Sequence, residues 1–279
     1  MCARILIADE AGACYGVERA LELVRKAVGG ELPVKTLGPL IHNPAVVDEL
    51  AGAGVSAVED PADAAGELLV LRTHGVSPEV EAAARELCAE VIDAACPFVK
   101  RVHMVAKRMA AEGRRVVIVG EHGHPEAEAT RAQVEGAIIV SSPDEARAAE
   151  LGERVGVVVQ TTMAKSLLDE VMAALCERVD DVVLENTICD ATSGHQRAAA
   201  ELAREADAMV VVGGRNSANT RHLAEIARDI CPRTHHIEDA DELEAAWFEG
   251  AELIGITAGA STPASQIEAV RARIAELAG

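Results

Sequence analysis

Aromatic residues are almost absent from this chain of 279 residues, at 1% of its composition. A core without aromatic side chains has to be built from aliphatic ones, and hydrophobic residues make up 49% of the chain. Buried parallel strands covered by helices use mainly Val, Ile and Leu, so this composition favours an α/β protein. The length leaves room for two or three small domains.

Long apolar runs are also missing. No stretch reaches the roughly 18 consecutive apolar residues of a membrane helix. The first residues, Met1 to Glu10, lack the basic start and apolar run of an export signal. We therefore expect a protein without a membrane partner and, by default, a cytoplasmic location.

Positive charge is scarce, because 26 Lys and Arg residues stand against 46 Asp and Glu residues, for a formal net charge of −20. Binding to phosphate backbones needs clustered Lys and Arg, so this balance argues against nucleic acid as a partner. An anionic substrate would have to be held by local donors. Nine histidines and the N-termini of helices are the groups available for that purpose.

The seven cysteines include no Cys-x-x-Cys pair, and their odd number argues against a disulfide framework. Three of them, Cys14, Cys96 and Cys189, lie at expected strand-to-helix transitions and are 82 and 93 residues apart. Such spacing suits an iron-sulfur cluster to which three α/β units each supply one thiolate. The remaining cysteines are interpreted as ordinary thiols: Cys2, Cys88, Cys176 and Cys231.

Apolar runs alternate with amphipathic stretches of helical period from end to end, which is typical of parallel sheets with helical crossovers. The pattern predicts three pseudo-equivalent α/β lobes, residues 1–96, 97–189 and 190–279, with boundaries near the second and third of these cysteines. Strands are expected at 4–8, 68–71, 116–119, 155–159, 209–212 and 253–257. Helices are expected at 17–26, 97–111, 164–176, 191–203 and 220–230.

Polar clusters follow several of these strands, where open parallel sheets bind their ligands. The segment Glu121-His122-Gly123-His124-Pro125-Glu126 is consistent with a metal site or with a loop for proton transfer and anion binding, and a solvated polar loop is the plainer alternative. His42 and His74 occupy similar positions before expected helices. Together with His124 they could converge on one anion site.

Hydroxyl and amide donors occur at the same positions after other strands. Ser217 and Asn219 follow the strand at 209–212, Ser261 follows the last strand, and Thr161 follows the strand at 155–159. These small donors lie at the starts of expected helices, as donors do in phosphate-binding loops, although they match no Walker or dinucleotide motif. They also make good helix caps, so this signal is weak by itself.

Nine motifs in one order resemble the LytB family of 4-hydroxy-3-methylbut-2-enyl diphosphate reductases, from the last step of the non-mevalonate isoprenoid pathway. The resemblance extends from Gly12 to Pro263. The motifs are Gly-x-Cys-x-Gly-Val, Leu-Gly-Pro-Leu-Ile-His-Asn-Pro, Thr-His-Gly-Val, Asp-Ala-x-Cys-Pro-Phe-Val, Gly-His-Pro-Glu, Gln-Thr-Thr, Thr-Ile-Cys-x-Ala-Thr, Asn-Ser-x-Asn-Thr and Thr-Ala-Gly-Ala-Ser-x-Pro.

The resemblance implies three lobes around a central 4Fe-4S cluster held by Cys14, Cys96 and Cys189. One iron would lack a protein ligand and would act as a Lewis acid on the substrate's allylic hydroxyl. Two electrons, from ferredoxin or flavodoxin, and two protons would remove water and yield isopentenyl and dimethylallyl diphosphates. Glu126 would supply a proton and Thr161 would position the hydroxyl. The diphosphate would be held by His42, His74, His124, Ser217, Asn219 and Ser261.

Three positions depart from the family pattern: Ala13 stands where Phe is common, Ala218 replaces a frequent Ser, and His195 replaces a frequent Arg.

Two other functions compete with the reductase. Quinolinate synthase also uses three lobes and three cysteines, but it is not expected to carry the Gly-His-Pro-Glu and Asn-Ser-x-Asn motifs. An iron-sulfur binding or redox-sensing module without turnover is the other alternative.

Overall fold

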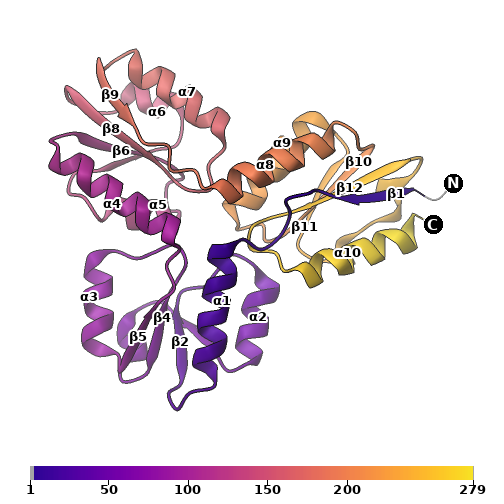
Figure 1. The fold of residues 1–279 in the computed structure, drawn as a ribbon, viewed down its shortest axis with the longest axis horizontal. Helices are drawn as coiled ribbons and strands as arrows, with labels where there is room; N and C mark the ends of the chain where they lie inside the picture. The colour runs from indigo at the N-terminus through magenta and orange to yellow at the C-terminus, as the bar shows by residue number, and fades with distance from the viewer. Residues whose placement is uncertain (1–2, 279) are drawn as a thin grey trace. The chain divides into compact units, whose positions relative to one another are not determined.

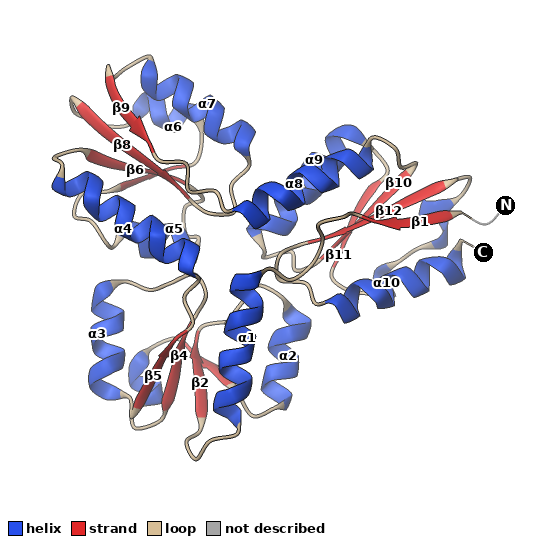
Figure 2. Ribbon diagram, viewed as in Figure 1, coloured by secondary structure: helices blue, strands red, loops and turns tan. Residues whose placement is uncertain are grey.

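The structure is a computed structural model that describes residues 3–278. Twelve strands and ten α-helices alternate along these residues, and the strands form three four-stranded sheets (Figure 1, Figure 2). Every strand pair is parallel, so the predicted class of three parallel α/β lobes is confirmed. The elements are β1 (Arg4–Ile7), α1 (Tyr15–Val28), β2 (Val34–Leu37), α2 (Pro44–Gly52), β3 (Ser56–Val58), β4 (Leu68–Leu71), α3 (Pro78–Leu87), β5 (Glu90–Asp93), α4 (Pro97–Ala111), β6 (Arg115–Val119), α5 (Pro125–Arg131), β7 (Ile138–Val140), α6 (Pro143–Ala148), β8 (Arg154–Val159), α7 (Lys165–Cys176), β9 (Asp181–Leu184), α8 (Asp190–Ala203), β10 (Ala208–Val212), α9 (Ala218–Ile230), β11 (Thr234–Ile237), β12 (Leu253–Ala258) and α10 (Ala264–Leu277).

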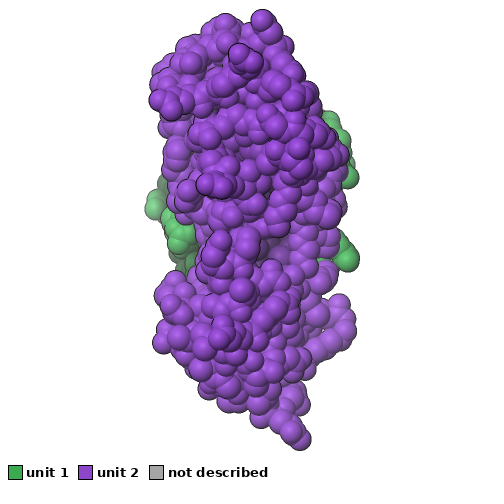
Figure 3. Space-filling view, turned by 90° about the vertical axis from the view of Figure 1, so that its left-hand side faces the viewer, with its two compact units in different colours: residues 1–17, 42–48, 190–279 green, residues 18–41, 49–189 purple. Residues whose placement is uncertain are grey.

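The chain divides into two compact units (Figure 3). Unit 1 comprises Met1–Val17, His42–Asp48 and Asp190–Gly279, and it holds the sheet β1-β12-β10-β11. Unit 2 comprises Glu18–Ile41 and Glu49–Cys189, and it holds the sheets β3-β2-β4-β5 and β7-β6-β8-β9. The division therefore runs through helices α1 and α2.

The central strands β4, β6, β8, β10 and β12 are mainly apolar because helices cover both faces of each sheet. In unit 1, Val210 and Val212 of β10 pack in the core cluster that includes α10, whereas Met209 and Val211 pack with α8 and α9 on the other face. Figure 2 shows these helices on opposite faces of the sheet. Alternate side chains of one strand thus enter two different cores.

The sheet of β6 and β8 in unit 2 follows the same rule. Val117 and Val119 of β6 lie in the core cluster with α6 and α7. Val116 and Ile118 lie in the cluster with α4 and α5. Burial on both faces fixes the register of β6 and so places the loop after Val119, where part of the predicted site lies.

Six strands, β2, β3, β5, β7, β9 and β11, have no counterpart among the strands expected from the sequence. Five of the six lie at sheet edges, where one neighbour is missing and polar residues are tolerated. β11, for example, reads Thr-His-His-Ile, which carries no apolar run for pattern analysis to detect. The expected strands all have counterparts in the structure.

The predicted lobe boundaries after residues 96 and 189 fall directly before α4 and α8. The structure differs from the expected division at the N-terminus, because β1 pairs with β12 and not with a strand of residues 34–93. A single short strand gives no sign in sequence of which sheet it joins. The boundaries otherwise stay a prediction.

Across residues 3–278, each helix is too short or too polar to serve as a membrane span.

Candidate active site

The predicted site residues of unit 2 follow the carboxyl ends of its parallel strands. His74 follows β4, Glu126 follows β6 and Thr161 follows β8, while Cys96 and Cys189 follow the edge strands β5 and β9. Parallel strands end at a common edge of their sheet, which is the usual place for a ligand in this architecture. The fold therefore gathers residues that are far apart in the sequence.

Glu126 is the buried carboxyl of this site, with 2% of its surface exposed. Its two oxygens accept hydrogen bonds from Thr161: the backbone N–H donates at 2.6 Å to Oε1, and the hydroxyl donates at 2.8 Å to Oε2. Burial raises the pKa of Glu126 to about 7, although both hydrogen bonds act in the opposite direction. Near neutral pH this carboxyl is balanced between its two protonation states, as a proton donor requires.

His124 is the cap of the short helix α5, on which Glu126 lies. Its Nδ1 accepts a hydrogen bond from the backbone N–H of Glu126 at 3.2 Å. A neutral imidazole that accepts at Nδ1 carries its proton on Nε2. The His124 ring meets the ring of His74 edge to face, with centroids 5.6 Å apart. Two of the three predicted anion-binding histidines are therefore neighbours in unit 2.

Cys96 and Cys189 are each anchored to a loop that carries another predicted site residue. The Cys96 N–H donates to the carbonyl of Thr73, next to His74, at 2.9 Å. The Cys189 N–H donates to the carbonyl of Thr161 at 3.1 Å. Both cysteines are partly buried, and each directly precedes a helix, α4 or α8.

The loop before α9 carries the predicted phosphate donors of unit 1. Ser217 caps the helix, since its Oγ accepts from the Thr220 N–H at 3.3 Å. Asn219 is 3% exposed, yet neither its amide nitrogen nor its amide oxygen finds a hydrogen-bond partner within residues 3–278. Buried amides are normally paired, so this orphaned side chain favours a polar ligand at the loop.

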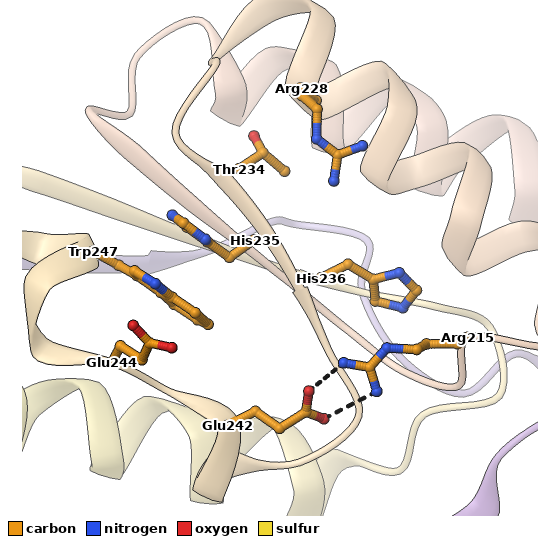
Figure 4. Close-up of a pocket in the computed structure, with 8 residues that line it drawn as sticks. All are labelled: Arg215, Arg228, Thr234, His235, His236, Glu242, Glu244 and Trp247. Atoms are coloured by element: carbon orange, nitrogen blue, oxygen red, sulfur yellow. Dashed lines mark hydrogen bonds and ion pairs between the residues drawn. The ribbon is translucent and has the colours of Figure 1, made fainter.

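A cavity of about 500 Å³ at the β11 edge of unit 1 lies behind this loop (Figure 4). Figure 4 shows Arg215 paired with Glu242 and the His235 ring parallel to Trp247, and the two rings are stacked with centroids 4.0 Å apart. His236 Nε2 bonds the carbonyl of Gly213 at 2.8 Å. The contacts of Arg215 and His236 tie the Gly213–Ser217 turn to the wall of this cavity.

His42 and Ser261 come together in unit 1 although 219 residues separate them. The Ser261 hydroxyl donates to the His42 carbonyl at 3.2 Å, and the Asn43 amide donates to the Ser261 carbonyl at 2.9 Å. Cys14 is tied to the same loop, because its N–H donates to the carbonyl of Ala260 at 3.0 Å. Gly12 makes the turn before it with φ of +96°, which favours glycine.

Several buried polar residues that support the site were not predicted individually. Asn43 caps α2 through its Oδ1, which accepts from the Val46 N–H at 3.2 Å. Gln160 Oε1 accepts from the Glu121 N–H at 3.0 Å, and Thr187 Oγ1 accepts from the Val159 N–H at 2.8 Å. The Asn-Pro pair before an expected helix could have revealed Asn43. Gln160 and Thr187 bridge between strands, and local sequence carries no sign of that.

His195, at a position where the family often has Arg, lies near the ion pair of Arg197 and Glu10. His195 is buried in α8, and burial lowers its pKa. The Glu10 carboxylate occupies the space over Gly194 that an added Cβ would fill, and Arg197 pairs with Glu10 at 2.6 Å. The cation of this region is thus provided by Arg197. The structure gives no account of Ala13, and the buried Ala218 is the first residue of α9.

Comparison with known proteins identifies the family. The family model described as LytB protein matches residues 5–275. The chain belongs to the LytB family. This result confirms the resemblance seen in the ordered sequence motifs.

Relatives in the LytB family align with this chain over almost their full length. Proteins named 4-hydroxy-3-methylbut-2-enyl diphosphate reductase are 42% identical over 275 residues in Pelobacter propionicus, 44% over 274 in Geobacter sulfurreducens and 42% over 278 in Aquifex aeolicus. The alignments cover 98% of this chain and 96 to 98% of each relative.

Two solved structures share the fold. One, of (E)-4-hydroxy-3-methyl-but-2-enyl diphosphate reductase, is 41% identical, with a TM-score of 0.72, and covers 99% of this chain and 100% of its own. The reductase from Plasmodium falciparum has a TM-score of 0.90 at 24% identity and covers 96% of this chain and 86% of its own, so it supports the fold alone.

Proposed function

We propose that this chain is a 4-hydroxy-3-methylbut-2-enyl diphosphate reductase. The reaction breaks the allylic carbon–oxygen bond, consumes two electrons and two protons, and releases water with isopentenyl or dimethylallyl diphosphate. The likeness to reductases over nearly the whole chain carries this proposal. The buried pair of Glu126 and Thr161 supports it, since loss of an oxygen from carbon needs a nearby proton donor.

Three cysteines fit a 4Fe-4S cluster by their chemistry and position. Cys14, Cys96 and Cys189 directly precede α1, α4 and α8, and cysteine thiolates are the usual ligands of iron-sulfur clusters. We propose that these three thiolates hold one cluster. Such a cluster, when bound, supplies electrons and one iron without a protein ligand as a Lewis acid.

Glu126 and Thr161 would manage the proton for the leaving oxygen. When Glu126 is protonated, its carboxyl can donate to Thr161 Oγ1, and the threonine hydroxyl is then free to turn its own proton toward the substrate. The 2.8 Å contact between Thr161 Oγ1 and Glu126 Oε2 is short enough for that transfer. The threonine would also orient the substrate's hydroxyl, because its side chain is held by the same contact.

The diphosphate would be bound by histidines and by neutral hydroxyl and amide donors. We propose six side chains for this role: His42, His74, His124, Ser217, Asn219 and Ser261. The unpaired amide of Asn219 supports this assignment, since a phosphate oxygen would accept from it. A His⁺ and a phosphate oxygen about 4 Å apart attract by roughly 4 kcal/mol at an effective dielectric near 20. Several such contacts can outweigh an acidic surface that salt screens beyond about 8 Å.

The electrons have to come from a partner, because the sequence carries no flavin or nicotinamide motif. We propose a carrier such as ferredoxin or flavodoxin. The cytoplasmic location stays a prediction.

Anaerobic turnover tests the proposed function. The cluster-reconstituted chain is mixed with reduced methyl viologen and 4-hydroxy-3-methylbut-2-enyl diphosphate, and both diphosphate products are quantified. We expect substrate-dependent oxidation of the viologen and formation of isopentenyl and dimethylallyl diphosphates. A cluster-loaded chain that forms neither product would favour the binding or sensing module, and formation of quinolinate from its own precursors would favour the synthase.

The raised pKa of Glu126 predicts a pH dependence of folding stability that needs no cluster. The native carboxyl holds its proton up to about pH 7, whereas the reference pKa is 4.5, so the folded state binds more protons between these values. Stability from this group is therefore greatest below pH 4.5 and is lost as the pH rises through 7. Relative to a Glu126→Gln variant, the wild-type free energy of unfolding should fall by up to about 3 kcal/mol between pH 4.5 and pH 8. Urea unfolding of both proteins at each pH measures this, and parallel curves would show that the carboxyl is ionised throughout.

A further inference from the structure

Helix α4 of unit 2 differs in charge from the rest of the chain. It is the one α-helix of residues 3–278 that contains no Asp or Glu, and it carries Lys100, Arg101, Lys107 and Arg108. The chain as a whole has a formal net charge of −20. A helix with four cations and no anion is therefore an exception on this protein.

The cations share one side of α4. The opposite side is buried through five apolar residues, Val99, Val102, Val105, Ala106 and Met109, and the last four pack against the sheet of β6 and β8. Figure 1 shows α4 lying along this sheet. Met104 is 65% exposed among the cations, and Phe98 in the first turn is 37% exposed. Phe98, Lys100, Arg101, Met104, Lys107 and Arg108 are called the α4 surface.

Intramolecular ion pairs only partly occupy these cations. Lys100 pairs with Asp93, and Arg101 and Arg108 share Glu185 at 3.1 Å each. Lys107 forms no ion pair within residues 3–278. Exposed pairs of this kind contribute only about 0 to 1 kcal/mol. A carboxylate from another protein could therefore compete for these cations at little cost.

Stability of the fold does not explain the α4 surface. Lys100 and Arg101 lie near the N-terminus of the helix, where the dipole disfavours positive charge. The largely exposed side chain of Met104 also adds little to folding stability, because apolar side chains stabilise a fold when they are buried. A hollow of about 280 Å³ beside the helix adds a concave contact area, lined by Lys100, Met104 and Lys107 and also by Glu81 and Asp93. Exposed apolar side chains ringed by charge are typical of interaction sites.

We propose that the α4 surface docks an acidic one-electron carrier protein, and this rests on the proposed function. Helix α4 begins directly after Cys96, a proposed cluster ligand, and Met104 lies only about 12 Å further along the helix axis. A carrier seated here is close to the cluster. Two reduced carriers each give one electron, and together with two protons these convert the allylic alcohol into product and water.

Charge complementarity selects an acidic carrier. Most of this protein's surface repels such a partner, so a local cationic face would orient it during the encounter. Steering of this kind weakens as salt is added, because the charges are screened.

A comparison of two electron donors tests the docking surface. Turnover of the reconstituted full chain is measured with reduced plant-type ferredoxin, an acidic [2Fe-2S] carrier, and separately with reduced methyl viologen, which needs no docking. The test variant is Lys107→Glu with Arg108→Glu. The matched control is Arg271→Glu with Arg273→Glu on α10, which makes the same change in net charge and also breaks exposed ion pairs.

We expect the α4 variant to lose roughly tenfold in kcat/KM for the carrier, with the loss shrinking at high salt, while viologen-driven turnover stays within about twofold. The control should stay within about twofold with both donors. Equal kcat/KM with the carrier for the α4 variant and the α10 control would overturn the proposal that the α4 surface docks the carrier. If the double variant also loses viologen-driven turnover, Lys107→Gln is used in its place. We expect this single variant to lose roughly threefold in kcat/KM with the carrier and nothing with viologen. Unchanged kcat/KM with the carrier would overturn the proposal. A wild-type chain inactive with viologen would contradict the proposed function itself.

Discussion

Serine in place of Cys96 is expected to abolish turnover and to prevent stable reconstitution of the cluster. Cys96 is the N-cap residue of α4, and a serine hydroxyl is a poor ligand for iron. We expect iron content to fall well below that of the wild type and turnover to fall by at least about a hundredfold. Iron and sulfide analysis, with the viologen assay, measures both.

Cys88 provides the matched control for this substitution. It follows the C-terminal end of α3, and burial together with the charge of Glu67 raises its pKa, so its thiolate is disfavoured. Its Sγ lies 3.7 Å from the carbonyl of Pro61. Cys88→Ser should therefore keep the iron content and the turnover of the wild type. Equal iron content in Cys96→Ser and Cys88→Ser would remove Cys96 from the ligand set.

Glutamine in place of Glu126 should leave the cluster intact and slow turnover by about 10² to 10⁴, the usual contribution of a general acid. Glutamine keeps the shape of the side chain, and its amide oxygen can still accept from the Thr161 N–H. It has no acidic proton to pass to Thr161 Oγ1. The expected signature is a loss in kcat with iron content unchanged.

Glu128→Gln on the same helix is the control for Glu126→Gln. Glu128 pairs with Arg131 on the surface, and this hydrogen-bonded pair lies outside the buried contact with Thr161. Its replacement should change kcat by less than about twofold, as exposed pairs contribute little. If Glu126→Gln and Glu128→Gln are equally active, another group supplies the proton.

The sequence was most informative where a strand is buried on both faces. β6, β8, β10 and β12 each contain an apolar run of four or more residues, and such runs fix both the strand and the position of the loop after it. The positions of Glu126 and Thr161 beyond two of these strands could therefore be predicted. Their direct contact could not, because it depends on the order of strands in the sheet.

Long-range relations account for what sequence patterns missed. β1 was expected with the residues that follow it, yet its parallel partner is β12, near the other end of the chain. The His42–Asp48 segment belongs to unit 1 because Asn43 bonds the loop of Ser261, and nothing in its local pattern indicates that. The contact of Glu10 with Gly194 could not be predicted either, because the space that the missing Cβ leaves for the carboxylate is visible only in the folded structure.

Mössbauer spectroscopy of the anaerobically reconstituted chain tests most directly whether three cysteines hold one 4Fe-4S cluster with an open iron. Spectra are recorded before and after addition of 4-hydroxy-3-methylbut-2-enyl diphosphate. We expect about one quarter of the iron signal to change when the substrate is added, since three thiolates leave one of four irons without a protein ligand. A spectrum in which no iron responds to the substrate, or in which all the iron responds alike, would contradict the account.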